Sequence, residues 1–246
     1  MASWDAEKTR KLVRALYGPD QLEIVREYIS SAIYRQRYTR FHFKEIKIIL
    51  GAYTGIHLKS EYITNSILIG NTKEQNDFEY CQTRIGAHVI AAVQSIYSLA
   101  DILVYTAYYS LGCNLLLSSR KENQYPLESI QTFFSKNIKY SKIEAIFNSI
   151  FDHKEFKYLT ALANHSKGHG LIKATLWFGA TGKPQNPYTL RFQEFKFEEK
   201  NYGNRLVRPF LENEYNRLSK ITAEIGSTLN SALTIKNNFD FISIFK

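Results

Sequence analysis

Cysteine is scarce in this chain, and the two that it has do not form a metal-binding pattern. Cys81 and Cys113 are the only cysteines, and no Cys-x-x-Cys pair exists. This spacing argues against a thiolate zinc site. We therefore expect two reduced thiols, as is usual for a cytoplasmic protein. A cysteine nucleophile stays an alternative, because its partners can be distant in sequence.

The glycine-rich loops that hold nucleotides are also missing. The sequence has no Gly-x-x-x-x-Gly-Lys-Ser/Thr loop, no Gly-x-Gly-x-x-Gly and no Gly-x-Ser-x-Gly. These absences argue against P-loop ATP chemistry, a dinucleotide-binding fold and an α/β hydrolase. We therefore expect a protein without a cofactor.

Long hydrophobic runs are few. Residues 1–8 have no apolar run behind basic residues, so we expect no secretion signal. Residues 89–117 form a long apolar stretch in which Asp101 is the only charge. A central aspartate costs roughly 2.5–3.5 kcal/mol on insertion into a bilayer, and serines, tyrosines and amides also interrupt the stretch. We interpret it as the buried core helix of a soluble protein and expect no membrane association.

Acidic side chains are outnumbered by basic ones. The chain has 32 Lys and Arg against 23 Asp and Glu, which gives a formal net charge of +9 at pH 7. This excess favours a polyanionic partner such as RNA, although a basic and merely soluble surface is the alternative. The hydrophobic share of 44% is enough for a real core, and we expect one domain over residues 1–246.

Helical periodicity dominates the pattern of apolar residues. It predicts a mainly α fold: a helical bundle with a small β-hairpin before the C-terminal helix. Gly18-Pro19 should end the first helix and start the next, with another break near Tyr38-Thr39. The expected segments are N-terminal helices over 1–70, a core bundle over 71–169, a hairpin over 171–198 and a C-terminal helix over 207–236.

The finer pattern predicts one long helix over residues 73–111 and three shorter ones after it. The shorter helices should cover residues 127–136, 141–151 and 153–163. Alternation then predicts strands over 171–180 and 188–198, joined by the turn-rich residues 181–187. The alternation shifts at Gln193-Glu194, which predicts a bulge in the second strand.

Reactive side chains are concentrated in residues 164–170, where the helical pattern gives way to the strand pattern. Asn164, His165, Lys167 and His169 all lie in this segment. A metal would need a third ligand beside the two histidines, and Lys167 disfavours a cation, so we expect no metal here. An anion or phosphate site is the better hypothesis. The alternative is that these side chains cap the last carbonyls of the helix.

Three residues of the long helix could support such a site. Arg84 and His88 are four apart and share one helix face, where they could offer a phosphate-binding cation beside a titrating group. Asp101 belongs to a polar and aromatic stripe and could orient a catalytic histidine or lysine. The alternatives are structural: an Arg paired with a carboxylate, a core histidine, and a hydrogen-bond network around Asp101.

The order of elements and the residues 158–169 resemble a group of bacterial helical proteins with an Asn-x-x-Lys-His motif. They also resemble, more distantly, the HEPN superfamily of helical bundles. Many HEPN proteins are metal-independent ribonucleases of toxin and phage-defence systems, marked by an Arg with a His about five to seven positions later. Here Ala163 stands in place of that Arg, and the spacing from Arg84 to His88 is too short.

The resemblance implies an RNA-binding protein or a metal-independent ribonuclease of bacterial defence, which we would expect to be cytoplasmic and homo-oligomeric. His169 would be the general acid or base, Lys167 or Arg84 would stabilise the phosphate, and Asn164 would position it. One alternative is a non-catalytic helical module that binds a protein partner or a small anionic ligand. Another is a metal-dependent hydrolase.

Overall fold

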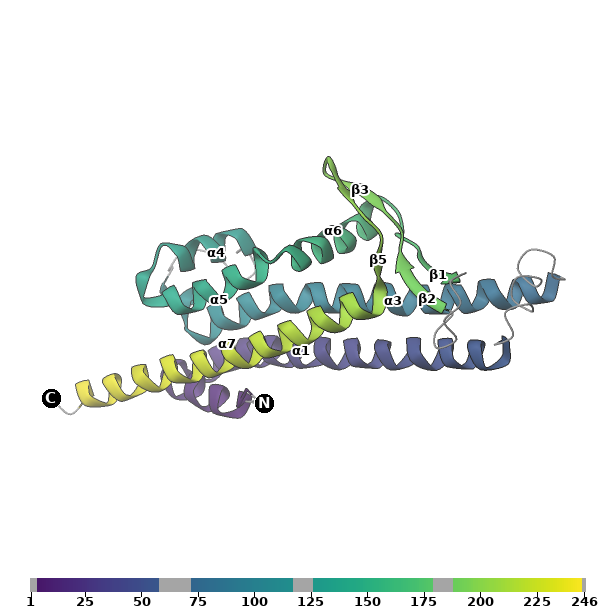
Figure 1. Cartoon of the computed structure of the whole chain (residues 1–246). Coiled ribbons are helices and arrows are strands. Elements are labelled where there is room, and N and C mark those ends of the chain that lie inside the picture. The colour runs from purple at the N-terminus through teal and green to yellow at the C-terminus, as the bar shows by residue number, and fades with distance from the viewer. Residues whose placement is uncertain (1–3, 58–71, 117–125, 179–187, 245–246) are drawn as a thin grey trace. The chain divides into compact units, whose positions relative to one another are not determined.

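The computed structural model describes residues 4–57, 72–116, 126–178 and 188–244, and most of them are helical (Figure 1). The mainly α fold with a small strand region before the C-terminal helix is confirmed. The helices are α1 (Ala6–His57), α3 (Thr72–Ser110), α4 (Leu127–Ser135), α5 (Ser141–Phe151), α6 (Lys154–Gly168) and α7 (Val207–Ile244), with short 3₁₀ turns at Cys113–Leu116 and Ile138–Tyr140.

The predicted helix break at Gly18-Pro19 agrees with the structure, whereas the predicted end of the C-terminal helix at residue 236 is wrong, because α7 continues to Ile244. Gly18 interrupts α1 with φ 87° and ψ −178°, a left-handed φ that glycine adopts without a steric penalty, and Pro19 follows it. The predicted break at Tyr38-Thr39 is wrong, because α1 continues through both residues. Thr39 is only 1% exposed, and its burial outweighs the few tenths of a kcal/mol by which threonine disfavours a helix.

The strand region is more divided than the predicted hairpin. Strands β1 (Ala174–Phe178), β2 (Tyr188–Phe192) and β5 (Arg205–Leu206) form an antiparallel sheet in the order β1-β2-β5. Strands β3 (Phe195–Phe197) and β4 (Lys200–Tyr202) form a separate hairpin. The predicted turn over residues 181–187 lies outside the described residues.

The strand predicted to bulge at Gln193-Glu194 in fact ends at Phe192 and restarts in the second sheet. Leu190 and Phe192 share one side of β2, and both are buried. Phe195 and Phe197 have the opposite parity, so in a continuous strand they would point to the other side. Dividing the strand lets Leu190 and Phe192 stay buried while Phe195 and Phe197 become half-buried in the second sheet.

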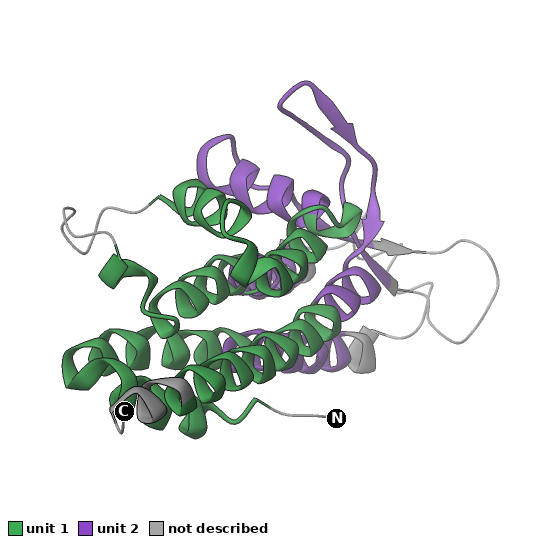
Figure 2. Cartoon of the chain, turned by 90° about the vertical axis from the view of Figure 1, so that its left-hand side faces the viewer, with its two compact units in different colours: residues 1–36, 96–156, 215–246 green, residues 37–95, 157–214 purple. Residues whose placement is uncertain are grey.

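The described chain divides into two compact units (Figure 2). Unit 1 comprises residues 1–36, 96–156 and 215–246, and unit 2 comprises residues 37–95 and 157–214. Helices α1, α3 and α7 each contribute residues to both units. The single domain expected from chain length stays a prediction.

The core of unit 1 is rich in aromatic rings. Tyr28 stacks between Tyr105 and Tyr109 at centroid distances of 5.5 and 5.0 Å. Tyr108 is 1% exposed and meets Phe134 edge-on. Burial raises the pKa of Tyr28, Tyr105 and Tyr109. Of the tyrosines that follow Asp101 in the polar and aromatic stripe, Tyr108 is therefore a core residue, and Tyr105 is half-buried.

One helix of the described chain, Gln75–Ser110 within α3, is long and apolar enough to cross a membrane. Half of its most apolar window is buried inside the protein, as in the core helix of a soluble protein. The cytoplasmic location stays a prediction.

The N-terminal segment of unit 1 is anchored on α7. The Trp4 indole donates a hydrogen bond to Thr9 Oγ1 at 2.8 Å, and Thr9 Oγ1 donates to Asn230 Oδ1 at 2.7 Å. The Trp4 ring lies directly over Gly226, so a methyl group added there would overlap it. Gly226 is thus required for this close approach rather than for its backbone angles.

We predict opposite effects for two helical glycines. Gly226→Ala should lower the free energy of unfolding by about 1–3 kcal/mol, because the Trp4 ring must move. Gly86→Ala in α3 is the matched control: an added methyl meets nothing within 4 Å, so this change should stabilise by about 0.5–1 kcal/mol. Urea denaturation measures both changes. Equal effects of the two substitutions would contradict the Trp4 contact.

Candidate functional site

The four residues predicted to form the site lie at the C-terminal end of α6. This helix continues to Gly168, five residues beyond the predicted end at residue 163. His165 and His169 therefore face each other across one helical turn, with ring centroids 5.7 Å apart. Asn164 and His165 are half-buried, whereas Lys167 and His169 are exposed. We call His165 and His169 the histidine pair.

A backbone carbonyl sets the tautomer of His165. Its Nδ1 lies 2.8 Å from the carbonyl oxygen of Gly170. A carbonyl can only accept, so Nδ1 must carry the hydrogen and donate it. Gly170 has φ 113°, a value that favours glycine and turns its carbonyl back toward the helix. When the ring is neutral, Nε2 of His165 keeps a lone pair for proton transfer.

Aromatic side chains of β3 form a wall beside the histidine pair. The ring of Phe195 meets His165 edge-on at a centroid distance of 5.5 Å. Phe197 meets His165 at 6.2 Å and His169 at 5.4 Å. The histidine pair therefore projects from the end of α6 toward the β3–β4 hairpin, and His169 is the more exposed of the two.

Tyr158 of α6 holds this hairpin in place. Its ring meets Phe195, Tyr202 and Phe210 edge-on at 5.0–5.7 Å, and its hydroxyl donates to the Gly203 carbonyl at 3.1 Å. The Arg205 guanidinium lies 4.1 Å from the centroid of the Tyr158 ring. Burial raises the pKa of Tyr158, so its hydroxyl stays a donor at physiological pH.

Lys200 of β4 lies on the same face of the hairpin as Phe197. Lys167 is two residues from each histidine, and residues two apart on a helix do not face each other. Lys200 pairs directly with Phe197 across the hairpin, and cross-strand partners project from the same face. Lys200 is exposed and shares its face with the Phe197 ring that contacts both histidines. Lys196 projects from the opposite face and pairs with Glu199 at 2.9 Å.

Arg84 and His88 of α3 contact other residues of unit 2. Arg84 is exposed and lies 5.7 Å from the centroid of the Tyr80 ring. His88 is half-buried, and its Nδ1 lies 2.9 Å from Nδ1 of His42 in α1. Among the described residues, neither Arg84 nor His88 hydrogen-bonds or stacks with the histidine pair. Their supporting role stays a prediction.

Asp101 lies in unit 1, whereas the other predicted site residues lie in unit 2. It is half-buried and, after the burial of the ring itself, adds to the raised pKa of Tyr105, one helical turn further along α3. Its role in orienting a histidine or a lysine stays a prediction. Within the described ranges, no cluster of three His, Cys, Asp or Glu side chains could hold a metal ion.

A basic and aromatic face of α1 was missed in the sequence-based prediction. Tyr38, Phe41 and Ile48 are each about half exposed. The exposed cations of the same segment are Arg37, Arg40, Lys44 and Lys47. The signal was present in the sequence as Arg and Lys interleaved with aromatic residues over positions 35–47. We call residues 37–48 the α1 basic face.

Comparison of the chain with protein-family models, with curated proteins and with solved structures found no match. The resemblance to HEPN proteins therefore stays a prediction, and the proposals below depend on the geometry of the described residues.

The contact between His42 and His88 predicts a pH effect on stability. One Nδ1 must donate and the other accept, so the contact is lost when both rings are fully protonated. Burial, and then His88, lower the pKa of His42, while Glu45 opposes the shift. A histidine with a depressed folded-state pKa is destabilising once the unfolded chain binds the proton, below about pH 6.5.

The free energy of unfolding should therefore fall as the pH decreases from about 6.5 through the folded-state pKa of His42. His42→Gln should make this fall shallower, because glutamine does not titrate. Urea denaturation at a series of pH values between 5 and 8 measures the slope. An unchanged slope in the variant would show that the contact between His42 and His88 does not contribute to the pH dependence of stability.

Proposed function

We propose that this protein binds RNA and cleaves it at the histidine pair without a metal ion. The observation that carries the proposal is the placement of two imidazoles 5.7 Å apart, one of them held in a single tautomer by the Gly170 carbonyl. Two imidazoles at this separation can act on the two oxygens of one phosphodiester, one as a base and one as an acid.

The reaction would be an attack by the ribose 2′-oxygen on the adjacent phosphorus. Nε2 of neutral His165 takes the proton of the 2′-hydroxyl as the new O–P bond forms. Protonated His169 gives its proton to the 5′-oxygen as the old P–O bond breaks. The products are a 2′,3′-cyclic phosphate and a free 5′-hydroxyl, so atoms and protons balance. Each positioned proton transfer is worth ~10²–10⁴-fold in rate.

The charge on the reacting phosphate needs a cation. Lys200 shares a hairpin face with the Phe197 ring that contacts both histidines, so we assign the phosphate contact to it in preference to Lys167 or Arg84. A positioned ammonium stabilises the negative charge that develops in the transition state. Asn164 and Lys167 are three apart on α6 and share a different face, where they could position the flanking nucleotides.

The α1 basic face supports the RNA-binding part of the proposal. Exposed Tyr38 and Phe41 offer surfaces on which bases can stack, and Arg37, Arg40 and Lys44 beside them offer contacts to phosphates. Such a surface binds single strands with little sequence preference, and its affinity falls as salt increases.

The test is cleavage of a labelled single-stranded RNA in the presence of EDTA. We expect His165→Ala and His169→Ala each to lower the rate by ~10²–10⁴-fold. Lys200→Ala should be slower than its matched control, Lys196→Ala, because Lys196 lies on the opposite face of the same hairpin. An oligonucleotide with a 2′-deoxy sugar at the cleaved position should stay intact.

Two outcomes would overturn the catalytic proposal: wild-type protein that cleaves no RNA, or histidine variants that cleave at the wild-type rate. RNA affinity that does not change with salt concentration would overturn the binding part.

A further inference from the structure

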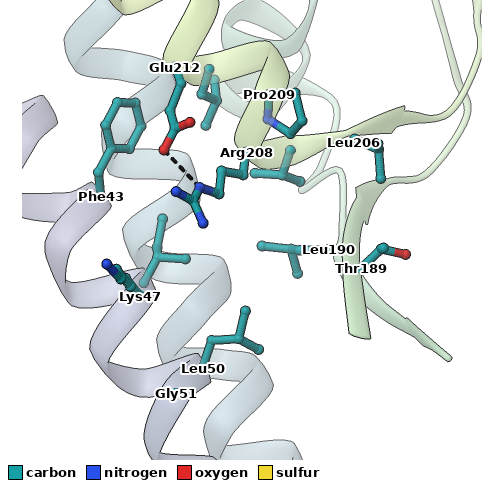
Figure 3. A pocket seen from close by; sticks show the side chains of 13 residues that line it. Phe43, Lys47, Leu50, Gly51, Thr189, Leu190, Leu206, Arg208, Pro209 and Glu212 are labelled. Atoms are coloured by element: carbon teal, nitrogen blue, oxygen red, sulfur yellow. Dashed lines mark hydrogen bonds and ion pairs between the residues drawn. The ribbon is translucent and has the colours of Figure 1, made fainter. Parts of the chain in front are cut away.

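A cavity of about 390 Å³ lies within unit 2, apart from the histidine pair (Figure 3). It is lined by residues of α1, of strands β2 and β5, and of the first turns of α7. Its apolar walls include Phe43 and Leu50 from α1, Leu190 from β2 and Leu211 from α7. The volume falls within the range of clefts that bind small molecules, about 300–1,000 Å³.

Two cations and one carboxylate lie among the residues that line the cavity. Arg208 Nε donates to Glu212 Oε1 at 2.8 Å, and Figure 3 shows the guanidinium extending from α7 toward α1. Lys47 is exposed and, within the part of the chain that the structure describes, has no carboxylate partner. The charged groups therefore carry one excess positive charge beside apolar walls.

We propose that this cavity binds a small amphipathic monoanion, a carboxylate with an apolar chain. Arg208 and Lys47 hold the carboxylate, and the leucine and phenylalanine side chains surround the chain. Glu212 orients the guanidinium by occupying Nε, which leaves the terminal nitrogens of Arg208 for the ligand. The same carboxylate repels a second negative charge, so a phosphate dianion fits this charge balance less well.

The cavity volume sets the size of the ligand. A water molecule in the liquid takes up about 30 Å³, so the cavity has room for about a dozen non-hydrogen atoms. Decanoate has this size and the required charge. Because burial of apolar surface strengthens binding, affinity should rise about fourfold with each added CH₂ group until the cavity is full.

Titration calorimetry of the full chain with decanoate, below its micelle concentration, tests the proposal. We expect saturable binding of one decanoate, with decanol and decylamine binding at least tenfold more weakly. Arg208→Gln and Lys47→Gln should each weaken decanoate about tenfold, which corresponds to the loss of one charge-assisted hydrogen bond. Lys44→Gln is the matched control, because Lys44 is an exposed lysine of the same helix that does not line the cavity.

A second variant tests the cavity itself. Leu190→Phe should fill part of the volume and abolish decanoate binding, and its thermal unfolding shows whether the protein still folds. The proposal is overturned if decanoate does not bind, if decanol binds as tightly as decanoate, or if Lys44→Gln weakens binding as much as Arg208→Gln. Because Arg208 lies outside both the histidine pair and the α1 basic face, RNA cleavage and decanoate binding can fail independently of each other.

Discussion

The geometry of unit 2 depends on the contacts that the Tyr158 ring makes. Tyr158 is 3% exposed, and it brings together helix α6, the β3–β4 hairpin and the first turns of α7 through Phe195, Tyr202 and Phe210. Arg205 covers the ring from β5 and interacts with the buried carboxylate of Glu214. Without this cluster the hairpin would have little to pack against, because an isolated two-stranded hairpin is at best marginally stable in water.

Both proposed sites follow from this arrangement. The hairpin places Phe195 and Phe197 against His165, and β5 leads directly into α7, whose first residues carry Arg208 and Glu212. The strand region thus lies beside the histidine pair. It also leads into α7, whose residue Arg208 lines the cavity. Sites that are built on packed helices and strands hold their side chains more accurately than sites on free loops.

Local signals in the sequence were enough for most of the fold but for only part of the site. The break at Gly18-Pro19 and the bounds of α5 were predicted, because glycine, proline and apolar spacing act over a few residues. The division of the second strand was not, since it depends on which side Phe195 must face to meet Tyr158 and Phe197 must face to meet the histidine pair. The choice of Lys200 over Lys167 likewise needs the register of β3 and β4. The resemblance to HEPN proteins pointed to residues 164–169, but it could not supply the partners of these residues.

The tautomer of His165 is the most direct test of this account. In a long-range ¹H–¹⁵N correlation spectrum of ¹⁵N-labelled protein, the neutral ring should carry its hydrogen on Nδ1, donated to the Gly170 carbonyl, with a free lone pair on Nε2. A His165→Gln variant assigns the signal. A neutral ring protonated on Nε2 would contradict the account, because neither the hydrogen bond from Nδ1 to the Gly170 carbonyl nor the proposed base at Nε2 would then exist.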